Sequence, residues 1–342
     1  MMPPRVTLTE VAEHAGVSVA TVSKVLNGRD DVADATRLRV EQIMNTLGYQ
    51  SRTELRSTKK RPSVLLILGN ADTVDLYSAS VLDGMLTEAQ KQDVSITVCR
   101  APAPRQINLT FLVQEVTRGG HDGVVVVTPV FTDKDLAYLV RRKIAVAMID
   151  PVDLTHSQGV SVGATNWTGG LTATQYLIEQ GHRRIGIVGG PQARLVARAR
   201  LHGYRAALEL AQIPFDPVVV KYGPFVAEAG RTLGGELLDL NPAPTAIFAT
   251  SDAAALGVMA AARERGLAIP ADLSVIGFDD TVAATLAVPP LTTIRQPLGE
   301  MGAEAIRAVL AQVRGEEVTV RRVELNTELV VRASVARPHS TR

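Results

Sequence analysis

Hydrophobic positions after Ser63 fall into short apolar runs that alternate with longer segments of helical periodicity. The runs are rich in Val, Ile and Ala, and Gly, Pro, Asn or Asp bounds each of them, which is typical of buried parallel strands. The runs are Val64–Leu68, Val124–Val127, Ile144–Ile149, Ile185–Val188, Ala246–Ala249 and Val275–Phe278. Segments such as Ser80–Gln92, Leu171–Gln180 and Ala253–Arg265 have the length of crossover helices. Repeated βαβ units of this kind predict α/β, doubly wound parallel sheets.

The first 50 residues show a different pattern, that of short amphipathic helices. Thr7-Leu-Thr-Glu10 matches a capping box, in which the Thr hydroxyl accepts from the third helical amide and the Glu reaches back to the cap. Gly16 permits a tight turn, and Ser18 is placed to cap a second helix that runs through Leu26. A third helix is expected at about Asp34 to Leu47. We therefore expect three short helices whose apolar stripes bury one another.

The first two of these helices are separated by only a few residues, which is the helix-turn-helix arrangement. In that motif the first helix braces the second, whose amino-terminal residues reach base edges in the major groove of DNA. The outward positions of the second helix are short and polar, and Lys24 lies one turn from its capped end, within reach of a base or a phosphate. The alternative is a small helical bundle that serves dimerisation or acts as a lid.

The distribution of charge favours the DNA-binding alternative. The net charge is only +1, but residues 1–62 hold 10 Lys or Arg against 7 Asp or Glu, whereas the remaining chain holds 26 against 28. Most of the excess lies between Arg52 and Arg61, a stretch that could also be an ordinary solvated linker. Next to a helix-turn-helix, such a basic stretch indicates contact with nucleic acid.

Composition excludes several other classes of protein. Hydrophobic residues make up 46% of the 342 residues, which excludes wholesale disorder. No apolar run approaches the length of about 18 residues that a membrane helix needs. Cys99 is the single cysteine, which forbids an internal disulfide and a Cys-based zinc site. We therefore expect a cytoplasmic protein with no membrane contact, no metal and no cofactor.

Sequence motifs of enzymes are also missing from the chain. Doubly wound sheets host dehydrogenases and hydrolases, but Gly186–Gly190 has the wrong spacing for a dinucleotide-binding loop. There is no P-loop, no G-x-S-x-G elbow and no H-E-x-x-H. The 6 His residues are scattered, and His182, beside Arg183 and Arg184, is expected in a surface loop. We predict that the protein is not an enzyme.

The segment Leu8–Asn27, with the sequence LTEVAEHAGVSVATVSKVLN, resembles the DNA-binding signature of the LacI/GalR family of transcriptional regulators almost residue for residue. The resemblance implies that Val19, Ala20 and Lys24 read bases, and that the polar residues around them mainly hold phosphates. Lys24 stands where many relatives have Arg, and a Lys lacks the bidentate fork, so the base preference at this position stays open. The implied DNA-binding residues are Thr7, Ser18, Val19, Ala20, Thr21, Ser23, Lys24, Asn27, Leu55 and Arg56.

The stretch that matches the hinge of the family departs from its pattern. The family commonly shows Ala-Arg-Ser-Leu, whose Leu wedges into the minor groove and kinks the operator. Here Leu55-Arg56-Ser57-Thr58 places Thr58 where the wedge should be. Either Leu55 takes over as the wedge, or Arg56 and the basic residues after it bind the DNA backbone with little kinking. We favour the second alternative.

The remaining chain is similar to the two-lobed core of the family, which is itself similar to periplasmic sugar-binding proteins. Landmarks of the family occur at Gly181–Gly186, Gly189–Pro191, Ala253–Gly257, Leu273–Asp280 and Leu291–Pro297. The expected fold is α/β, with a two-lobed doubly wound parallel-sheet core like that of periplasmic binding proteins, preceded by an all-α helix-turn-helix DNA-binding domain. The expected ranges are 1–50 for the DNA-binding domain, 51–62 for the hinge and 63–342 for the effector-binding and dimerisation core, with lobe one at about 63–162 plus 292–324 and lobe two at about 163–291 plus 325–339.

By position, the resemblance implies an effector site in the cleft between the lobes. Arg194 and Asp279 match the ligand-binding Arg and Asp of the family, a pair that can grip a vicinal diol, although an interlobe salt bridge is the alternative. Aromatic residues make up only 4% of the chain, so Trp167 and Phe225 in loops point to stacking on a sugar ring. Trp167 could instead pack beneath the second lobe, and Asp150 could merely cap a turn. The implied effector residues are Tyr77, Asp150, Trp167, Arg194, Phe225, Ser251 and Asp279.

The function expected from the whole chain is that of a sequence-specific transcriptional regulator, a repressor, controlled allosterically by a small sugar, either a monosaccharide or an oligosaccharide. A single helix-turn-helix domain, called the reading head below, buries little surface on DNA. Two such domains related by symmetry read two half-sites, so a homodimer on a pseudo-palindromic double-stranded operator is expected. A purine or nucleoside effector is the first alternative, since purine-binding relatives share the scaffold. A sugar-binding protein or an α/β enzyme without a role at DNA is a more distant one.

Overall fold

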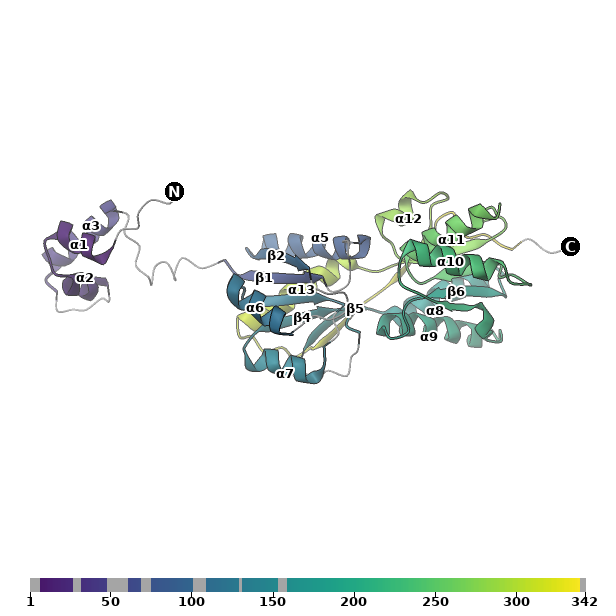
Figure 1. The fold of residues 1–342 in the computed structure, drawn as a ribbon, viewed down its shortest axis with the longest axis horizontal. Helices are drawn as coiled ribbons and strands as arrows, with labels where there is room; N and C mark the ends of the chain where they lie inside the picture. The colour runs from purple at the N-terminus through teal and green to yellow at the C-terminus, as the bar shows by residue number, and fades with distance from the viewer. Residues whose placement is uncertain are drawn as a thin grey trace. The chain divides into compact units, whose positions relative to one another are not determined.

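The computed structural model describes residues 7–26, 32–47, 61–68, 75–100, 109–128, 131–152 and 159–338. The chain divides into two compact units, Met1–Arg61 and Pro62–Arg342 (Figure 1). In the part of the chain that is described, no helix combines the length and the apolar character that crossing a membrane requires.

The first unit is built from three helices, as the spacing of apolar residues predicts. They are α1 (Leu8–Ala15), α2 (Val19–Leu26) and α3 (Asp34–Leu47). The capping box at the start of α1 is present, because the Thr7 amide donates to Glu10 Oε2 over 2.6 Å and the Glu10 amide donates to Thr7 Oγ1 over 3.3 Å. Gly16 ends α1 with a φ of 65°, the left-handed conformation that glycine adopts at low cost.

The apolar stripes of the three helices form one small core. Its members come from all three helices and from the segment before α3, and each is less than a tenth exposed, so the helices stabilise one another by burying these side chains. The buried members are Val11, Ala12, Ala15, Val22, Val25, Val32, Val40 and Met44. This packing leaves the opposite face of α2 open to solvent.

The second unit contains two six-stranded sheets among its described residues. Sheet one has the strand order β11-β5-β4-β3-β1-β2 and is parallel throughout. Its strands are β1 (Ser63–Leu68), β2 (Ser95–Arg100), β3 (Gly123–Val127), β4 (Ala145–Ile149), β5 (Val160–Ala164) and β11 (Arg322–Leu325). Its central strands are buried on both faces, which explains why they are continuous apolar runs rather than alternating ones.

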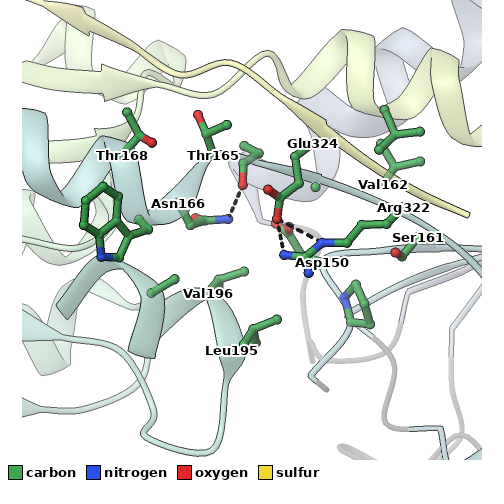
Figure 2. Close-up of a pocket in the computed structure, with 16 residues that line it drawn as sticks. Asp150, Ser161, Val162, Thr165, Asn166, Thr168, Leu195, Val196, Arg322 and Glu324 are labelled. Atoms are coloured by element: carbon green, nitrogen blue, oxygen red, sulfur yellow. Dashed lines mark hydrogen bonds and ion pairs between the residues drawn. The ribbon is translucent and has the colours of Figure 1, made fainter. Parts of the chain in front are cut away.

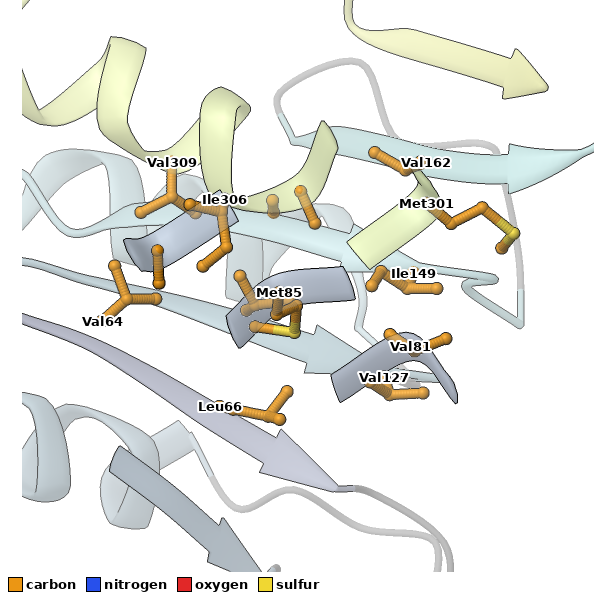
Figure 3. Packing of buried hydrophobic residues seen from close by; sticks show 14 of the residues in the cluster. Val64, Leu66, Val81, Met85, Val127, Ile149, Val162, Met301, Ile306 and Val309 are labelled. Atoms are coloured by element: carbon orange, nitrogen blue, oxygen red, sulfur yellow. The ribbon is translucent and has the colours of Figure 1, made fainter. Parts of the chain in front are cut away.

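Helices cover both faces of sheet one. One face packs against α5 (Leu76–Lys91) and α13 (Leu298–Val313), with side chains such as Met85 and Ile306 between helices and strands (Figure 3). The other face packs against α6 (Leu109–Gly119) and α7 (Asp133–Arg141). The first pair crosses at very short range, since a Cβ added at Gly84 would lie 1.8 Å from the carbonyl oxygen of Gly299.

Sheet two has the strand order β12-β10-β9-β8-β6-β7, with only β12 antiparallel to its neighbour. Its strands are β6 (Ile185–Gly189), β7 (Val220–Tyr222), β8 (Ala246–Ala249), β9 (Ser274–Asp279), β10 (Thr292–Arg295) and β12 (Glu328–Val330). The remaining helices are α8 (Asn166–Glu179), α9 (Leu195–Leu210), α10 (Ala227–Leu238), α11 (Asp252–Glu264), α12 (Val282–Leu286) and the short 3₁₀ helix η1 (Pro217–Val219). Helices α8 and α9 contribute to the core on one face, and α10 and α11 to the core on the other.

The chain passes between the two sheets three times, after β5, after β10 and after β11. The expected range of lobe one was wrong at β10, which belongs to sheet two. Thr292 of β10 pairs in parallel register with Ile276 of β9, and Thr292 and Thr293 are fully buried there. Strand β5 also continues in sheet one as far as Ala164, slightly beyond the expected boundary. These pairings depend on residues far apart in the sequence, which local periodicity does not record.

Candidate functional site

Helix α2 presents a short polar surface on the first unit. The Thr21 amide donates to Ser18 Oγ over 3.1 Å, and the two hydroxyls lie 2.9 Å apart, so the expected cap of α2 is present. Val22 and Val25 point into the core, whereas Ala20 and Lys24 are exposed. Val19 is 42% exposed. The geometry therefore leaves the expected base-reading positions accessible.

The outer parts of the expected DNA interface are only partly described. Thr7 caps α1, and Ser23 is half-buried in α2. Asn27, Leu55 and Arg56 lie outside the described residues, as does Thr58. The two alternatives for the hinge therefore stay predictions.

In the second unit, polar side chains gather where the strands of sheet one end. Asp150 directly follows β4 with a φ of 45°, a strained conformation for this residue. Its carboxylate accepts a hydrogen bond of 2.6 Å from the hydroxyl of Tyr77, in the first turn of α5. Burial raises the pKa of Asp150, and burial together with the neighbouring carboxylate holds the pKa of the Tyr77 hydroxyl well above its usual range. Asp150 therefore takes part in a contact between two elements and does more than cap a turn.

A second polar cluster lies at the corresponding end of sheet two, around Arg200 of α9. Arg200 is 3% exposed, and its Nη1 lies 3.7 Å from Oδ1 of Asp279 at the end of β9. Its Nε donates to Asn166 Oδ1 over 2.8 Å, and its Nη1 donates to the Thr250 carbonyl over 2.6 Å. The guanidinium also lies 3.8 Å from the ring centre of Phe278. The arginine is thus held by hydrogen bonds, an ion pair and an aromatic face together.

Two buried carboxylates in this cluster have raised pKa values. Burial raises the pKa of Asp279 to about 8, although the positive charge of Arg200 opposes the shift. Burial likewise raises the pKa of Asp252 to about 6, although Asp252 accepts hydrogen bonds from Thr281 and Thr293. Asp279 has a φ of 119°, so backbone strain and an unfavourable charge occur at the same residue.

The clusters of the two sheets lie within electrostatic reach of each other. The charges of Asp279 and Arg200 both act on the pKa of Tyr77, and the charge of Arg200 acts on Asp150. The amide of Leu195, at the start of α9, also donates to the carbonyl of Val152 over 3.3 Å. The ends of the two sheets therefore face one common region, as expected for lobes that share a cleft.

One polar atom in this region has no protein partner. Gln296, which follows β10, donates through Nε2 to Asp279 Oδ1 over 2.7 Å. Its Oε1 is buried without a hydrogen-bond partner among the described residues. A buried acceptor without a donor costs about 1–3 kcal/mol, so a donor from a ligand would be favourable at this point.

Asp279 forms its ion pair with Arg200, a residue that is not among those expected from the sequence. The expectation that Arg194 and Asp279 both bind the ligand stays a prediction, and the alternative, a salt bridge of Asp279, is met by Arg200. Arg194 stands at the N-cap position of α9, half-buried, and its charge acts on Asp150 instead. Arg200 could have been found from the helical spacing of the sequence. It lies on the same inward stripe of α9 as the buried Ala197 and Tyr204, and an Arg at such a position needs a buried partner.

Phe225 and Ser251 lie at the ends of sheet two, as expected. Phe225 is half-buried, and its ring lies 5.5 Å from the guanidinium of Arg200. A Cβ added at Gly190 would lie 2.1 Å from this ring, so the glycine makes room for it. Ser251 is buried and caps α11, since its Oγ accepts from the Ala254 amide over 3.1 Å. The hydroxyl of Ser251 keeps its proton and a second lone pair for a ligand.

A cavity of about 320 Å³ opens beside these clusters (Figure 2). Strands β5 and β11 of sheet one line one side, and the first turns of α8 and α9 line the other. Trp167 lines the cavity and is 46% exposed, which excludes the alternative that it packs beneath the second lobe. Arg322 and Glu324 form an ion pair at the β11 side. The lining residues are Asp150, Pro151, Ser161, Val162, Gly163, Ala164, Thr165, Asn166, Trp167, Thr168, Leu195, Val196, Ala199, Arg322, Val323 and Glu324.

The described part of the chain holds no group of three or more His, Cys, Asp or Glu side chains arranged to bind a metal ion. The expected position of His182 was wrong, because this side chain is only 1% exposed. Its Nδ1 lies 2.9 Å from Thr245 Oγ1, and its Nε2 lies 2.9 Å from the carbonyl of Ala336. The imidazole thus joins the turn after α8 to the carboxyl-terminal segment, a contact that local sequence does not reveal.

Two family models match the chain. The model described as "Bacterial regulatory proteins, lacI family" matches residues 7–51, and the model described as "Periplasmic binding protein-like domain" matches residues 174–335. The first match covers α1, α2 and α3, and the second covers most of the elements of sheet two. The first match extends over most of the first compact unit, and the second lies within the second compact unit.

Curated relatives match over nearly the full length. The chain is 33% identical to the HTH-type transcriptional repressor CytR of Escherichia coli (strain K12), over 96% of both chains. It is 32% identical to the HTH-type transcriptional regulator DegA of Bacillus subtilis (strain 168), over 97% of this chain and 98% of that one. It is 33% identical to the HTH-type transcriptional regulator CelR of Thermobifida fusca, over 96% and 98%.

Solved structures show the same fold. A complex of the transcriptional regulator CelR with cellobiose superposes with a TM-score of 0.73 at 32% identity, over 96% of this chain and all of that chain. The lac repressor dimer bound to operator and the anti-inducer ONPF superposes with a TM-score of 0.72 at 26% identity, over 97% of this chain and all of that chain.

Proposed function

The chain belongs to the lacI family of bacterial transcriptional regulators. We propose that it is a repressor that binds a pseudo-palindromic operator as a homodimer. A small sugar is proposed to change its affinity for this operator. The single observation that carries the effector assignment is the placement of Asp150 and Asp279 at the ends of two sheets, both buried and both in strained backbone conformations. Strain of this kind clusters at ligand sites.

The reading head is proposed to act through α2. Val19, Ala20 and Lys24 contact base edges, while Thr7, Ser18, Thr21, Ser23 and Asn27 hold phosphates. In the hinge, we favour Arg56 and the basic residues after it as backbone contacts, with little kinking of DNA. Gel phasing distinguishes the alternative, because Leu55→Ala reduces operator bending only if Leu55 is the wedge, and Thr58→Ala then serves as the control.

The effector is proposed to bind between the two polar clusters. Carboxylates of Asp150 and Asp279 accept from sugar hydroxyls, the guanidinium of Arg200 donates to them, and Gln296 Oε1 accepts a further hydroxyl. Phe225 and Trp167 offer apolar faces for a sugar ring. Tyr77, Arg194 and Ser251 complete the proposed set from the surrounding elements.

The class of effector is proposed from this chemistry. The solved relative CelR is in complex with cellobiose, whereas another relative, 29% identical, is the HTH-type transcriptional repressor PurR of Vibrio atlanticus. A site with two carboxylates and an exposed Trp suits a neutral ligand with many hydroxyls better than a planar base, so a mono- or oligosaccharide is favoured. A purine or nucleoside is the alternative.

A thermal-shift screen of the purified protein tests the effector class. The panel contains monosaccharides, cellobiose and other oligosaccharides, nucleobases and nucleosides. A ligand at 100 times its dissociation constant stabilises the fold by about 2.7 kcal/mol, which raises the melting temperature measurably. A shift with sugars supports the proposal, and a shift with purines or nucleosides alone overturns the sugar assignment while leaving the regulator assignment in place.

The homodimer is proposed partly from an exposed apolar patch. Val282 and Leu286 of α12 and Val288 in the loop after it are all more than half exposed. Apolar patches of this kind mark protein contacts, and an operator with two half-sites requires two reading heads. Analytical ultracentrifugation of the wild-type protein and of Leu286→Glu tests the assignment, because a dimer that depends on this patch dissociates in the variant.

Control of DNA binding is proposed to work through closure of the lobes on the effector. The effector must then bind the DNA-competent and DNA-incompetent states with different affinities, and a 100-fold coupling corresponds to about 2.7 kcal/mol. Titration of operator binding with and without the effector found in the screen measures this coupling and its sign.

A further inference from the structure

Four exposed cations gather at the edge of sheet one where its strands begin. Arg118 lies in the last turn of α6, Arg141 ends α7, and Arg142 and Lys143 form the turn into β4. We call these four residues the basic edge. Helices α6 and α7 cover the same face of the sheet, and both end at the edge where the strands begin. Within the described ranges, none of the four side chains forms an ion pair, and Arg142 lies over the ring of Tyr138 at 5.0 Å.

The basic edge lies where the chain enters the second unit from the linker. The Ser63 amide, the first in β1, donates to Asp122 Oδ2 over 2.8 Å, and the Ser63 hydroxyl lies 2.7 Å from His121 Nδ1. Val64 pairs with Gly123, and Gly123 pairs with Ala145, two residues after Lys143. With neighbouring strands about 4.8 Å apart, β4 starts about 10 Å from the end of the linker. The linker carries the basic stretch Arg52–Arg61. The basic edge therefore lies close to the point where a positively charged segment of the chain ends.

The corresponding edge of sheet two pairs part of its positive charge locally. Arg184, directly before β6, forms an ion pair of 2.7 Å with Asp216, and Arg265, directly after α11, forms one of 2.8 Å with Asp239. Arg183 and Arg263 at this edge are exposed and form no ion pair within the described residues, and cations near helix carboxyl ends are favourable in any protein because they complement the helix dipole. The basic edge differs from this edge in lying beside the linker and in having no ion pair at any of its four cations.

We propose that the basic edge binds phosphates of the DNA backbone, in addition to the contacts made by α2. The inference rests on the proposed binding of DNA. Arginine and lysine side chains that are exposed and unpaired give up no existing ion pair when they bind a phosphate, and they release the counterions condensed on DNA. Such contacts carry no sequence information, so they strengthen specific and non-specific binding equally.

The double variant Arg118→Gln/Arg141→Gln tests the proposal. The matched control is Arg263→Gln/Arg337→Gln, which removes the same charge from two exposed residues, one in the last turn of α11 and one in the carboxyl-terminal segment. Full-length proteins are titrated, over a series of salt concentrations, with a duplex of about 40 base pairs that the wild-type protein recovers from a random library and with a shuffled duplex of equal length. Each lost phosphate contact lowers the slope of log K against log salt by about 0.9. We expect the test variant to lose about 1.8 in slope per protomer, with the same fold loss on both duplexes, and the control to match the wild type.

Three results would overturn the proposal. They are an unchanged slope in the test variant, an equal decrease in the control, and a loss confined to the recovered duplex. Melting temperatures of both variants within a degree or two of the wild type show that folding is intact, as expected for exposed side chains. If the wild-type protein recovers no duplex from the library, the proposed function itself fails, which is a different result from failure of the basic edge.

Discussion

Nη1 of Arg200 lies 3.7 Å from Oδ1 of Asp279, and both side chains are buried where sheet two ends. The contact joins α9 to β9, and the hydrogen bond from Gln296 to the same carboxylate oxygen extends it to the crossover before α13. An ion pair in this setting costs desolvation on both sides, so it is better suited to holding a ligand site in shape than to adding stability.

Replacing Arg200 is expected to be far more damaging than replacing Arg194. Arg200→Gln leaves Asn166 Oδ1 and the carbonyl of Thr250 without their donor, which costs about 1–3 kcal/mol of unfolding free energy for each buried acceptor. Arg194→Gln, at a half-buried position, should cost less than about 1 kcal/mol. Urea denaturation of both variants measures the difference. Equal losses would contradict the structural role assigned to Arg200.

The stability of the folded chain is expected to fall between about pH 4 and pH 8 because of Asp279. Its pKa is about 8 in the folded chain, against about 4 in an unfolded one. In this window the folded state binds more protons than the unfolded state. The contribution of Asp279 to the free energy of unfolding is therefore complete below pH 4 and is lost as the pH rises through 8, by at most about 1.4 kcal/mol per pH unit. Asp279→Asn removes that slope. Urea denaturation at several pH values compares it with the wild type, and parallel pH profiles would contradict the raised pKa.

Lys24→Ala is expected to reduce specific operator binding while leaving the effector affinity unchanged. A Lys that reads a base contributes about 1–3 kcal/mol of discrimination, so the variant should lose about 5-fold or more on the recovered duplex and less on a shuffled one. Fluorescence anisotropy on both duplexes measures the ratio. Equal loss on both would mean that Lys24 contacts only phosphate.

Gly84→Ala is expected to destabilise the second unit, whereas Gly299→Ala should be tolerated. A Cβ at Gly84 would lie 1.8 Å from the Gly299 carbonyl oxygen, so α5 and α13 must separate. A Cβ at Gly299 meets its nearest atom at 3.8 Å, which is ordinary contact. Overpacking of this kind costs about 1–3 kcal/mol, and thermal denaturation of the two variants detects it. Similar melting temperatures for both would show that the helices adapt without cost.

Local sequence was sufficient for the elements and for part of the site. Apolar runs bounded by Gly, Pro or Asp became the central strands, because a strand that is buried on both faces needs an unbroken apolar run. The capping box at Thr7 and the turn at Gly16 also formed as expected, since their interactions span only a few residues. Tyr77 and Asp279 were named from the resemblance to the family, and Asp150 also because it follows a predicted strand; the structure places Asp150 and Asp279 at strand ends and Tyr77 in the first turn of α5.

The sequence by itself thus determined the helix-turn-helix, the two parallel sheets and the regulator family, because periodicity, caps and motifs are local properties of the chain. Only the tertiary structure decided that β10 joins sheet two, that Arg200 forms the ion pair with Asp279, and that His182 is buried. Each of these depends on contacts between residues distant in sequence. The free energy of such contacts is set by burial and by available hydrogen-bond partners, and a single sequence does not record which partners the fold supplies.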